Sequence, residues 1–214
     1  MVDYLVVIDF EANAQRHGVI YPQEITEFPG VIIDVAHQTI DRKNTFQQYC
    51  KIKKRLDPFA TELTGITQEQ VDAGQPFPIV LEAFMKWLRT SIPSGHSYLV
   101  VTCGDWDFRT CFPKQCNFSG IPVPPIFTSW CNVKKIYCQV LNRRRAGGMK
   151  AMLENLGLPL RGRHHSGIDD ALNIAEICLY LLRCGALFEV TGTLQDKRIR
   201  RVYRWEACSK KKQI

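Results

Sequence analysis

The sequence predicts an α/β protein in which a mixed central sheet of about five strands carries helices on both faces. Two observations favour this class. Apolar, β-branched runs typical of buried strands come first, arranged as a meander. Further along the 214-residue chain, such runs alternate with segments of helical periodicity. Strands that are apolar throughout need cover on both sides, so helices are expected on both faces.

Three strands are expected near the beginning of the chain. They are residues 4–10, 31–37 and 46–52, with a turn at 41–44 between the last two. The first of them ends in carboxylates. Residues 11–28 carry polar and turn-forming side chains and are expected to form a long loop. A further buried strand is expected at 98–102.

Helical periodicity marks the remaining elements. The expected helices are residues 58–63, 67–72, 78–89, 129–141, 149–156 and 168–184. Thr67 and Gln70 have the spacing of a capping box, which satisfies free backbone groups at a helix start. Gly157 and Pro159 end the helix before them. The segment 168–184 gives the clearest pattern, because its apolar residues recur on one face.

Composition excludes several classes of protein. No apolar run approaches the roughly 20 residues that cross a bilayer. The first residues lack the basic segment of a secretory signal, so neither export nor a membrane partner is expected. Nine cysteines, an odd number without Cys-x-x-Cys spacing, favour a reducing compartment, the cytoplasm or the nucleus. The alternative is a zinc site, although the spacings match no standard ligand pattern. Its candidate ligands are Cys103, Cys111, Cys116, Cys131 and Cys138.

Most of the chain's net positive charge lies in its last residues. The net charge is +7, and residues 196–214 alone carry +6. We therefore divide the chain into a folded domain, 1–194, and a basic tail, 195–214. Tyr203 and Trp205 interleave with the tail's arginines, a pattern suited to phosphates and base faces. The alternative is a solvated extension that contacts nothing specific.

Asp9 and Glu11 end the first expected strand. Side chains at i and i+2 of a strand share one face, so both carboxylates converge while Phe10 points the other way. Converging carboxylates repel each other unless a proton or cation lies between them, and hard divalent cations bind such oxygens. The pair alone does not identify a metal site, because Asp-x-Glu at a strand end is also common as an exposed cap.

Two aspartates follow the strand at 98–102. The segment Cys103-Gly104-Asp105-Trp106-Asp107 lies where open α/β sheets bind ligands, at the carboxyl ends of strands. The structural alternative is that Asp105 caps a helix while Trp106 belongs to the core. Even under that alternative, Asp107 has no structural role and is available to bind a ligand.

A third group of polar residues opens the helix at 168–184. Ser166 and Asp169 have capping-box spacing, which gives Asp169 a structural role and leaves Asp170 free. His165 lies on the preceding loop, where a histidine of near-neutral pKa can accept a proton from water. The alternative is that His164 and His165 are two exposed loop residues.

Five stretches carry a specific resemblance. The chain resembles the Asp-Glu-Asp-Asp-His exonucleases of the ribonuclease-H-like fold, and is similar to the histone-mRNA 3′-end and enhanced-RNAi (Eri-type) 3′-to-5′ exoribonucleases. The stretches are 7–12, 22–29, 62–67, 101–107 and 165–175, in the family's order. The resemblance covers about residues 4–190 and implies hydrolysis of RNA from its 3′ end with release of nucleoside 5′-monophosphates.

The resemblance also implies roles for single residues. The metal ligands would be Asp9, Glu11, Asp107 and Asp170, holding two Mg²⁺ or Mn²⁺ ions, with His165 as the general base. The substrate-binding residues would be Phe10, Ala12, Thr64, Gly65, Ile66 and Trp106. Both His164–Asp169 and His165–Asp170 keep the family's His-x4-Asp spacing. The serine and glycine that follow His165, together with the capping role of Asp169, favour the second pair.

Two other functions compete with this prediction. A DNA-directed 3′ exonuclease of the same fold would use the same carboxylates. A non-catalytic RNA-binding module on a decayed exonuclease fold would have lost a carboxylate, and none is lost. The expected partner is nucleic acid, RNA with a free 3′ end.

Overall fold

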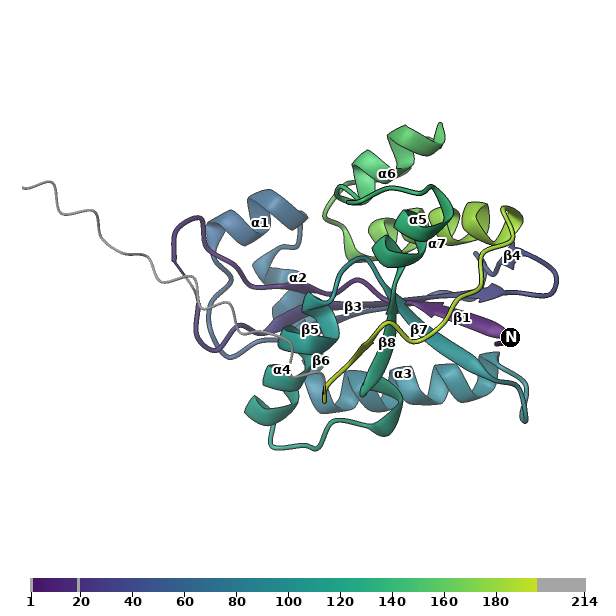
Figure 1. Ribbon diagram of the computed structural model, residues 1–214. Coiled ribbons are helices and arrows are strands. Elements are labelled where there is room, and N and C mark those ends of the chain that lie inside the picture. The colour runs from purple at the N-terminus through teal and green to yellow at the C-terminus, as the bar shows by residue number, and fades with distance from the viewer. Residues whose placement is uncertain (1, 19, 196–214) are drawn as a thin grey trace, which may run out of the picture.

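A mixed sheet forms the centre of the molecule, seen in a computed structural model that describes residues 2–18 and 20–195 (Figure 1). The strand order is β6-β5-β3-β1-β7-β8-β9, and β2 and β4 both pair with β3. The five longer strands are β1 (Tyr4–Val7), β3 (Ile25–Asp34), β5 (Phe46–Lys51), β7 (Tyr98–Thr102) and β8 (Ser129–Asn132). The two-residue strands are β2 (Glu11–Ala12), β4 (Thr39–Ile40), β6 (Gln75–Pro76) and β9 (Gly192–Thr193). The predicted mixed α/β sheet is confirmed.

Strand direction divides the sheet into two parts. β1, β7 and β8 run parallel to one another, whereas β1 pairs with β3, and β3 with β5, in antiparallel register. Parallel neighbours need a crossover, and helices supply both crossovers here. The carboxyl ends of β1, β7 and β8 therefore meet at one edge of the sheet.

Helices cover both faces of the sheet (Figure 1). One face packs against α5 (Val133–Val140), α6 (Met149–Leu156) and α7 (Gly167–Arg183). The other packs against α3 (Phe77–Ser91) and α4 (Phe112–Phe118). β1 is apolar throughout because it contacts both helical layers. Leu5 and Val7 pack on the side of α5, α6 and α7, and Val6 packs on the side of α3 and α4. Burial of such side chains contributes roughly 1.5–3 kcal/mol each.

Two short helices stand apart from these layers. α1 (Pro58–Thr64) and α2 (Gln68–Ala73) pack around a third, smaller core that includes Leu56 and Val71. The predicted capping box of α2 is confirmed: Thr67 accepts the Gln70 backbone N–H, and the Gln70 side chain accepts that of Thr67. An Asp57 side-chain cap fixes the start of α1.

Three predicted elements are wrong in their bounds. The first strand ends at Val7 rather than residue 10, and the expected loop 11–28 contains β2 and the start of β3. β3 is almost entirely buried although it carries Glu27, because the Glu27 carboxylate accepts hydrogen bonds from Gln47, Gly167 and Ile168. Residues 129–141 form β8 followed by α5, not one helix, and the Asn132 side chain caps α5.

Other differences are smaller. Residues 35–38 make the reversal after β3, and β4 lies between that reversal and the predicted turn at 41–44. A π-helix, η1 (Asp107–Cys111), precedes α4, and a 3-10 turn, η2 (Pro125–Phe127), precedes β8. The tail from residue 196 lies outside the described residues. No helix in the described part of the chain has the length and apolar character needed to cross a bilayer.

Candidate active site

Asp9 and Glu11 converge although they do not share one regular strand. Asp9 lies two residues beyond the end of β1, and Glu11 lies in β2, where a register irregularity interrupts its pairing with β3. Both carboxylates nevertheless come together with that of Asp170, each offering an oxygen within 4.8 Å of the others. The predicted convergence is therefore present, produced by a kinked chain rather than by strand alternation.

The Phe10 side chain points away from the carboxylates, as predicted. Its ring lies in an aromatic core, edge-on to Phe28 at 4.7 Å and stacked on Phe112 at 5.6 Å between centroids. The Phe10 backbone faces the site instead: its N–H donates to Asp107 Oδ1 at 3.1 Å. One residue thus anchors the Asp9–Glu11 turn to the core and to the next carboxylate.

Asp107 is buried at the start of η1, directly after the segment that follows β7. The structural alternative for this segment is wrong. Trp106 is 41% exposed rather than part of the core. Asp105 accepts the indole N–H of Trp130 at 2.9 Å and forms an ion pair with Arg109, so its side chain does not cap the helix. Asp107 remains the carboxylate that turns toward Asp9.

Helix α7 is capped by a residue that the sequence interpretation missed. Ser166 occupies the N-cap position without a side-chain cap, so the predicted Ser166–Asp169 capping box is wrong. Asp169 instead accepts the backbone N–H of Arg163 at 2.8 Å. The buried Glu27 of β3 accepts the N–H groups of Gly167 at 3.0 Å and Ile168 at 3.1 Å. Its only sequence signal was an acidic residue inside stretch 22–29.

Asp170 connects this helix start to both histidines. Its carboxylate accepts the His165 backbone N–H at 2.9 Å and lies 3.1 Å from His164 Nδ1. The imidazole rings stack with centroids 3.9 Å apart, and His165 adopts a left-handed backbone, φ 67°. Neither histidine is fully exposed, so the alternative of two free loop histidines does not describe them.

The electrostatics of the site follow from crowding of negative charge. Burial, then the charges of Asp9 and Asp170, raise the pKa of Glu11 to about 10. Burial raises the pKa of Asp107 to about 6 against the stabilising hydrogen bond from Phe10. The pKa of Asp9 is raised well above its ordinary value by burial and by Asp107 and Asp170. Such a cluster is stabilised by protons or by a cation.

The donor set fits a divalent cation. Asp9, Glu11 and Asp170 offer converging carboxylate oxygens, the ligands that hard cations such as Mg²⁺ and Mn²⁺ prefer. No cysteine belongs to any group of three metal-ligating side chains found within residues 2–18 and 20–195. The zinc alternative therefore gains no support from the part of the chain that the structure describes.

The predicted substrate loop lies at the end of α1. Gly65 caps this helix in a left-handed conformation, φ 79°, which favours glycine. Thr64 and Ile66 are buried, and the Thr64 hydroxyl accepts the Ile66 N–H at 3.1 Å. The Arg163 guanidinium packs against Gly65 and donates to the Glu62 carbonyl at 2.9 Å. Arg163 thus joins this loop to the histidine segment.

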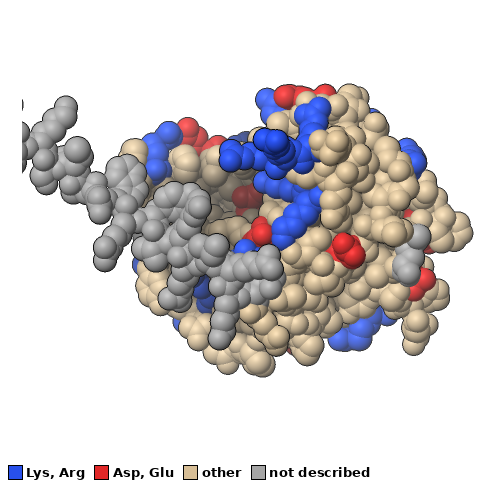
Figure 2. Space-filling view, viewed as in Figure 1, with Lys and Arg blue, Asp and Glu red and all other residues tan. Residues whose placement is uncertain are grey.

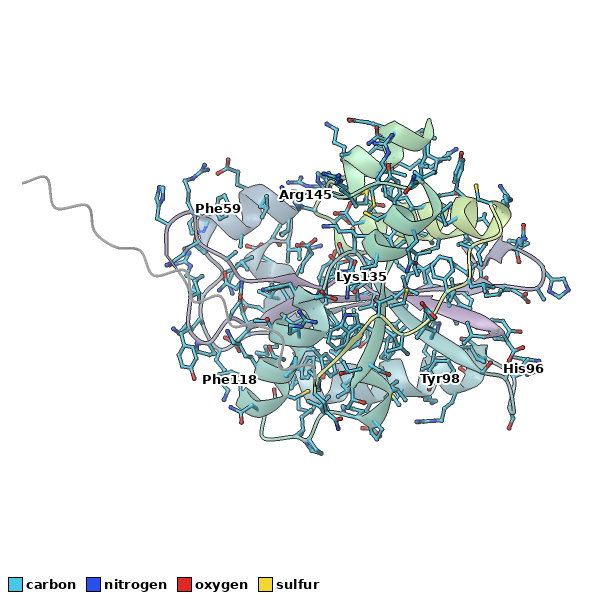
Figure 3. All side chains as sticks on the ribbon, viewed as in Figure 1. Phe59, His96, Tyr98, Phe118, Lys135 and Arg145 are labelled. Carbon is cyan, nitrogen blue, oxygen red and sulfur yellow. The ribbon has the colours of Figure 1, made fainter. Side chains whose placement is uncertain are left out.

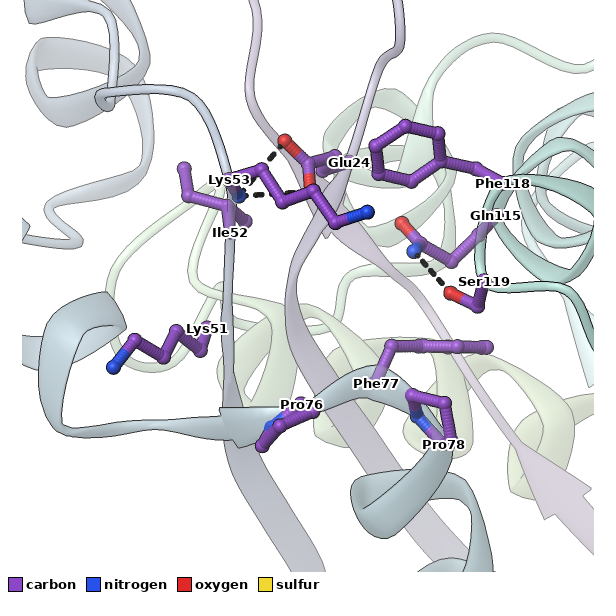
Figure 4. Close-up of a pocket in the computed structure, with 10 residues that line it drawn as sticks. All are labelled: Glu24, Lys51, Ile52, Lys53, Pro76, Phe77, Pro78, Gln115, Phe118 and Ser119. Atoms are coloured by element: carbon purple, nitrogen blue, oxygen red, sulfur yellow. Dashed lines mark hydrogen bonds between the residues drawn. The ribbon is translucent and has the colours of Figure 1, made fainter.

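The surface around the site is concave. Figure 2 shows acidic atoms inside a hollow, with basic atoms gathered above it and to its right. A separate cavity of about 590 Å³ opens between β5, the start of α3 and α4, and contains none of the candidate carboxylates (Figure 4). Its buried Glu24 accepts the backbone N–H groups of Lys53 and Lys54, and its Gln115 is hydrogen-bonded to Ile25 and Ser119.

Comparisons with known proteins agree with this geometry. The sequence pattern of the RNase T family, described as exonuclease, matches residues 6–178. ERI1 exoribonuclease 3 of Mus musculus is 38% identical over 193 residues, which are 88% of this chain and 56% of that protein. 3′-5′ exoribonuclease 1 of Homo sapiens is 36% identical over 188 residues, 86% of this chain and 53% of that protein. The chain spans about half the length of these relatives.

Solved structures show the same fold. The nuclease domain of 3′hExo, described as a DEDDh family member bound to rAMP, gives a TM-score of 0.84 at 35% identity, covering 90% of this chain and 98% of that one. A structure of histone mRNA stem-loop recognition by 3′-exonuclease gives 0.82 at 34% identity, covering 88% and 85%. Cell-death related nuclease 4 gives 0.82 at 29% identity, covering 88% and 67%. The expected ribonuclease-H-like architecture is confirmed, and the chain belongs to the RNase T family of exonucleases, with ERI1-type exoribonucleases among its relatives.

Proposed function

We propose that this chain is a metal-dependent 3′-to-5′ exoribonuclease that removes nucleotides from the 3′ end of RNA as nucleoside 5′-monophosphates, in RNA processing or turnover. One observation carries the proposal: carboxylates from three separate segments converge beside a histidine pair at one sheet edge. The eight described cysteines are free, which supports a reducing compartment, cytoplasmic or nuclear.

Asp9, Glu11, Asp107 and Asp170 would hold two Mg²⁺ or Mn²⁺ ions. Bound there, the ions would supply charge stabilisation for the attacking and leaving oxygens of an in-line displacement at phosphorus. The raised carboxylate pKa values describe a site whose negative charge is uncompensated in the absence of a cation. Four carboxylates also match the charge that two such ions introduce.

His165 would take the proton from the attacking water. Burial lowers its pKa and the adjacent His164 lowers it further, so the imidazole is neutral near pH 7 and can accept a proton. The new P–O bond forms as the bond from phosphorus to the 3′-oxygen of the preceding nucleotide breaks. That oxygen leaves the site carrying a proton.

Asp170, rather than Asp169, fits the ligand role. Asp170 is 3% exposed and lies with Asp9 and Glu11, whereas the Asp169 side chain is engaged with the Arg163 backbone. The pairing of His165 with Asp170 is therefore the one that we retain. His164, whose Nδ1 lies beside the same carboxylate, would hold Asp170 in place.

The terminal nucleotide would contact the loop Thr64, Gly65 and Ile66 and the backbone around Phe10 and Ala12. Since the side chains of Phe10, Thr64 and Ile66 are buried, the backbone and Gly65 would supply most of that surface. Trp106, half-exposed beside Asp107, has an accessible face on which a base can stack. The partner is RNA with a free 3′ end.

Matched RNA and DNA oligonucleotides, 5′-labelled, single-stranded or with 3′ overhangs, test this function. With Mg²⁺ we expect RNA to shorten from its 3′ end one nucleotide at a time and 5′-monophosphates to appear. EDTA and the Asp107→Asn variant should both abolish shortening. Preferential degradation of DNA would favour the DNA-directed alternative. RNA binding without degradation, in Mg²⁺ and also in Mn²⁺, would favour the non-catalytic module.

A further inference from the structure

Four basic side chains, here called the basic rim, lie along one side of the candidate active site. They are Lys134 in the first turn of α5 and Arg143, Arg144 and Arg145 in the chain between α5 and α6. Figure 3 labels Arg145 and the neighbouring Lys135 in this region. Figure 2 shows basic atoms gathered over the same region, beside the hollow that contains acidic atoms.

Topology explains why the basic rim lies beside the carboxylates. β1, β7 and β8 are parallel neighbours, so the segments that follow them emerge at one edge. Asp9 follows β1, Asp107 follows β7, and Lys134 follows β8. The Lys134 charge acts on both aspartates: it opposes the burial that raises the pKa of Asp9 and of Asp107. The rim thus begins next to the reacting centre and leads away from it.

The charges of the rim are available to a ligand. Arg143, Arg144 and Arg145 are exposed, and within the described ranges 2–18 and 20–195 neither they nor Lys134 forms an ion pair. Lys135 differs, because it donates to the Thr191 carbonyl and lies 3.9 Å from Asp105. Three adjacent arginines without carboxylate partners repel one another, so a bound anion would stabilise this segment.

The surface here is hollowed as well as basic. A cavity of about 540 Å³ lies between α5 and the chain that follows it, and its lining includes Lys134, Lys135, Arg144 and Arg145. Neither α5 nor the chain after it therefore needs to move to admit a phosphate. Lys134, which lines this cavity and whose charge acts on Asp9 and Asp107, connects it to the candidate carboxylates. Positive walls beside those carboxylates suit a strand whose last phosphodiester lies at them.

We propose that the basic rim binds the backbone phosphates of the nucleotides that precede the 3′-terminal one. This rests on the proposed exoribonuclease function, since only the last phosphodiester can lie at the carboxylates. The preceding phosphates must pass a cluster of negative side chains, and the rim offsets that repulsion. Contact is to phosphates and not to bases, so the rim strengthens binding without selecting a sequence.

Substrate length separates this role from catalysis. We compare the full chain with its Arg143→Ala/Arg144→Ala/Arg145→Ala variant on a 12-nucleotide RNA and on a dinucleotide, which lacks upstream phosphates. The variant should raise KM for the 12-mer at least tenfold and leave kcat for both substrates within twofold. Kinetics on the dinucleotide should be unchanged. If three contacts are lost, the slope of log KM against log salt should flatten by about 2.

A charge-matched control uses Lys43→Ala/Lys86→Ala/Arg89→Ala, three exposed basic residues outside the rim. This control should leave KM and its salt slope within twofold of wild type. An unchanged KM for the 12-mer in the arginine variant would overturn the proposal and favour a protein partner for the rim. An equal rise for both substrates would overturn it too, by placing the arginines at the terminal nucleotide. Wild type that degrades neither RNA would instead contradict the proposed function.

Discussion

The Glu27 carboxylate accepts the backbone N–H of Gly167 at 3.0 Å, across 140 positions of sequence. The contact joins strand β3 to the first residue of α7, three positions before Asp170. Since Glu27 also lies opposite Glu11 in the β2–β3 pairing, it links two segments of the carboxylate cluster. The interaction therefore fixes the first turn of α7 against β3.

Glu27→Ala should therefore reduce both stability and activity. It leaves the buried N–H of Gly167 and the partly buried N–H of Ile168 without their acceptor and should destabilise the fold by about 1–3 kcal/mol. It should also lower kcat by more than it raises KM, because Asp170 loses its position. Glu27→Gln retains one acceptor oxygen and should recover part of kcat. Chemical denaturation and steady-state kinetics measure the two effects.

Glu24→Ala is a matched control for that experiment. Glu24 is equally buried and accepts two backbone N–H groups, from Lys53 and Lys54, but it lies away from the carboxylates. It should cost similar stability and leave kcat nearly unchanged. A similar fall of kcat in both variants would show that Glu27 acts through general stability alone.

Acidification should stabilise the protein when no metal is present. The pKa of Glu11 is raised to about 10 in the fold, so the folded state binds a proton more tightly than the unfolded chain. Its stability is therefore greatest below the ordinary glutamate pKa and falls as pH rises above about 4.5. In EDTA, Tm should be higher at pH 5 than at pH 8, and saturating Mg²⁺ should restore the loss.

Glu11→Gln should remove activity and much of this pH dependence. At pH 8 glutamine removes the cost of protonating Glu11 on folding, and each relief of about 1 kcal/mol corresponds to a Tm rise of roughly 2–4 °C in EDTA. The same substitution should abolish the Mg²⁺-induced rise in Tm or weaken it strongly. A lower Tm than wild type in EDTA at pH 8 would contradict the clustering of charge that we infer.

The two histidines should differ in effect. His165→Asn should lower kcat by ~10²–10⁴, the range for loss of a general base, with little change in RNA binding. His164→Asn should be milder, because an amide can still reach the Asp170 carboxylate. The pH profile of kcat, measured for both, distinguishes proton acceptance from positioning. If His164→Asn showed the larger loss, His164 would be the base.

Truncation after Leu194 tests the basic tail. It removes +6 of the charge and retains β9, whose Gly192 pairs with Trp130 of β8. If the tail contacts phosphates, RNA affinity should fall and the salt slope should flatten by about 0.7 per lost contact, with kcat unchanged. Identical affinity and slope with and without the tail would assign it to another role.

Local patterns predicted the elements whose stability is local. The helix at 149–156 and the strand at 98–102 match α6 and β7 residue for residue, and α7 differs from its predicted bounds by one residue at each end. Amphipathic periodicity and stop residues such as Gly157 suffice there. The sequence also placed Asp9, Glu11 and Asp170 at the ends of regular elements, and the structure brings these three carboxylates together.

Elements that depend on distant partners were not predictable in this way. The beginning of β3 looks like a loop because Glu27 and Pro29 disfavour a buried strand, and only the fold supplies Gln47, Gly167 and Ile168 as partners for Glu27. Ser166 occupies the N-cap position, but the distant Glu27 accepts the N–H groups of Gly167 and Ile168 at this helix start. The left-handed backbone of His165 is uncommon for any residue other than glycine, so the sequence alone does not place it.

The position of Phe10 between two carboxylates has a mechanical consequence. Its ring is clamped by Phe28, Phe108 and Phe112, so the Asp9–Glu11 turn is as stiff as the aromatic cluster beneath it. Loosening that cluster, as in Phe112→Leu, would let the distance between Asp9 and Glu11 fluctuate while the fold stays intact. Metal affinity would then report on the packing of the interior, and core substitutions at this cluster would weaken the carboxylate site well before they prevented folding.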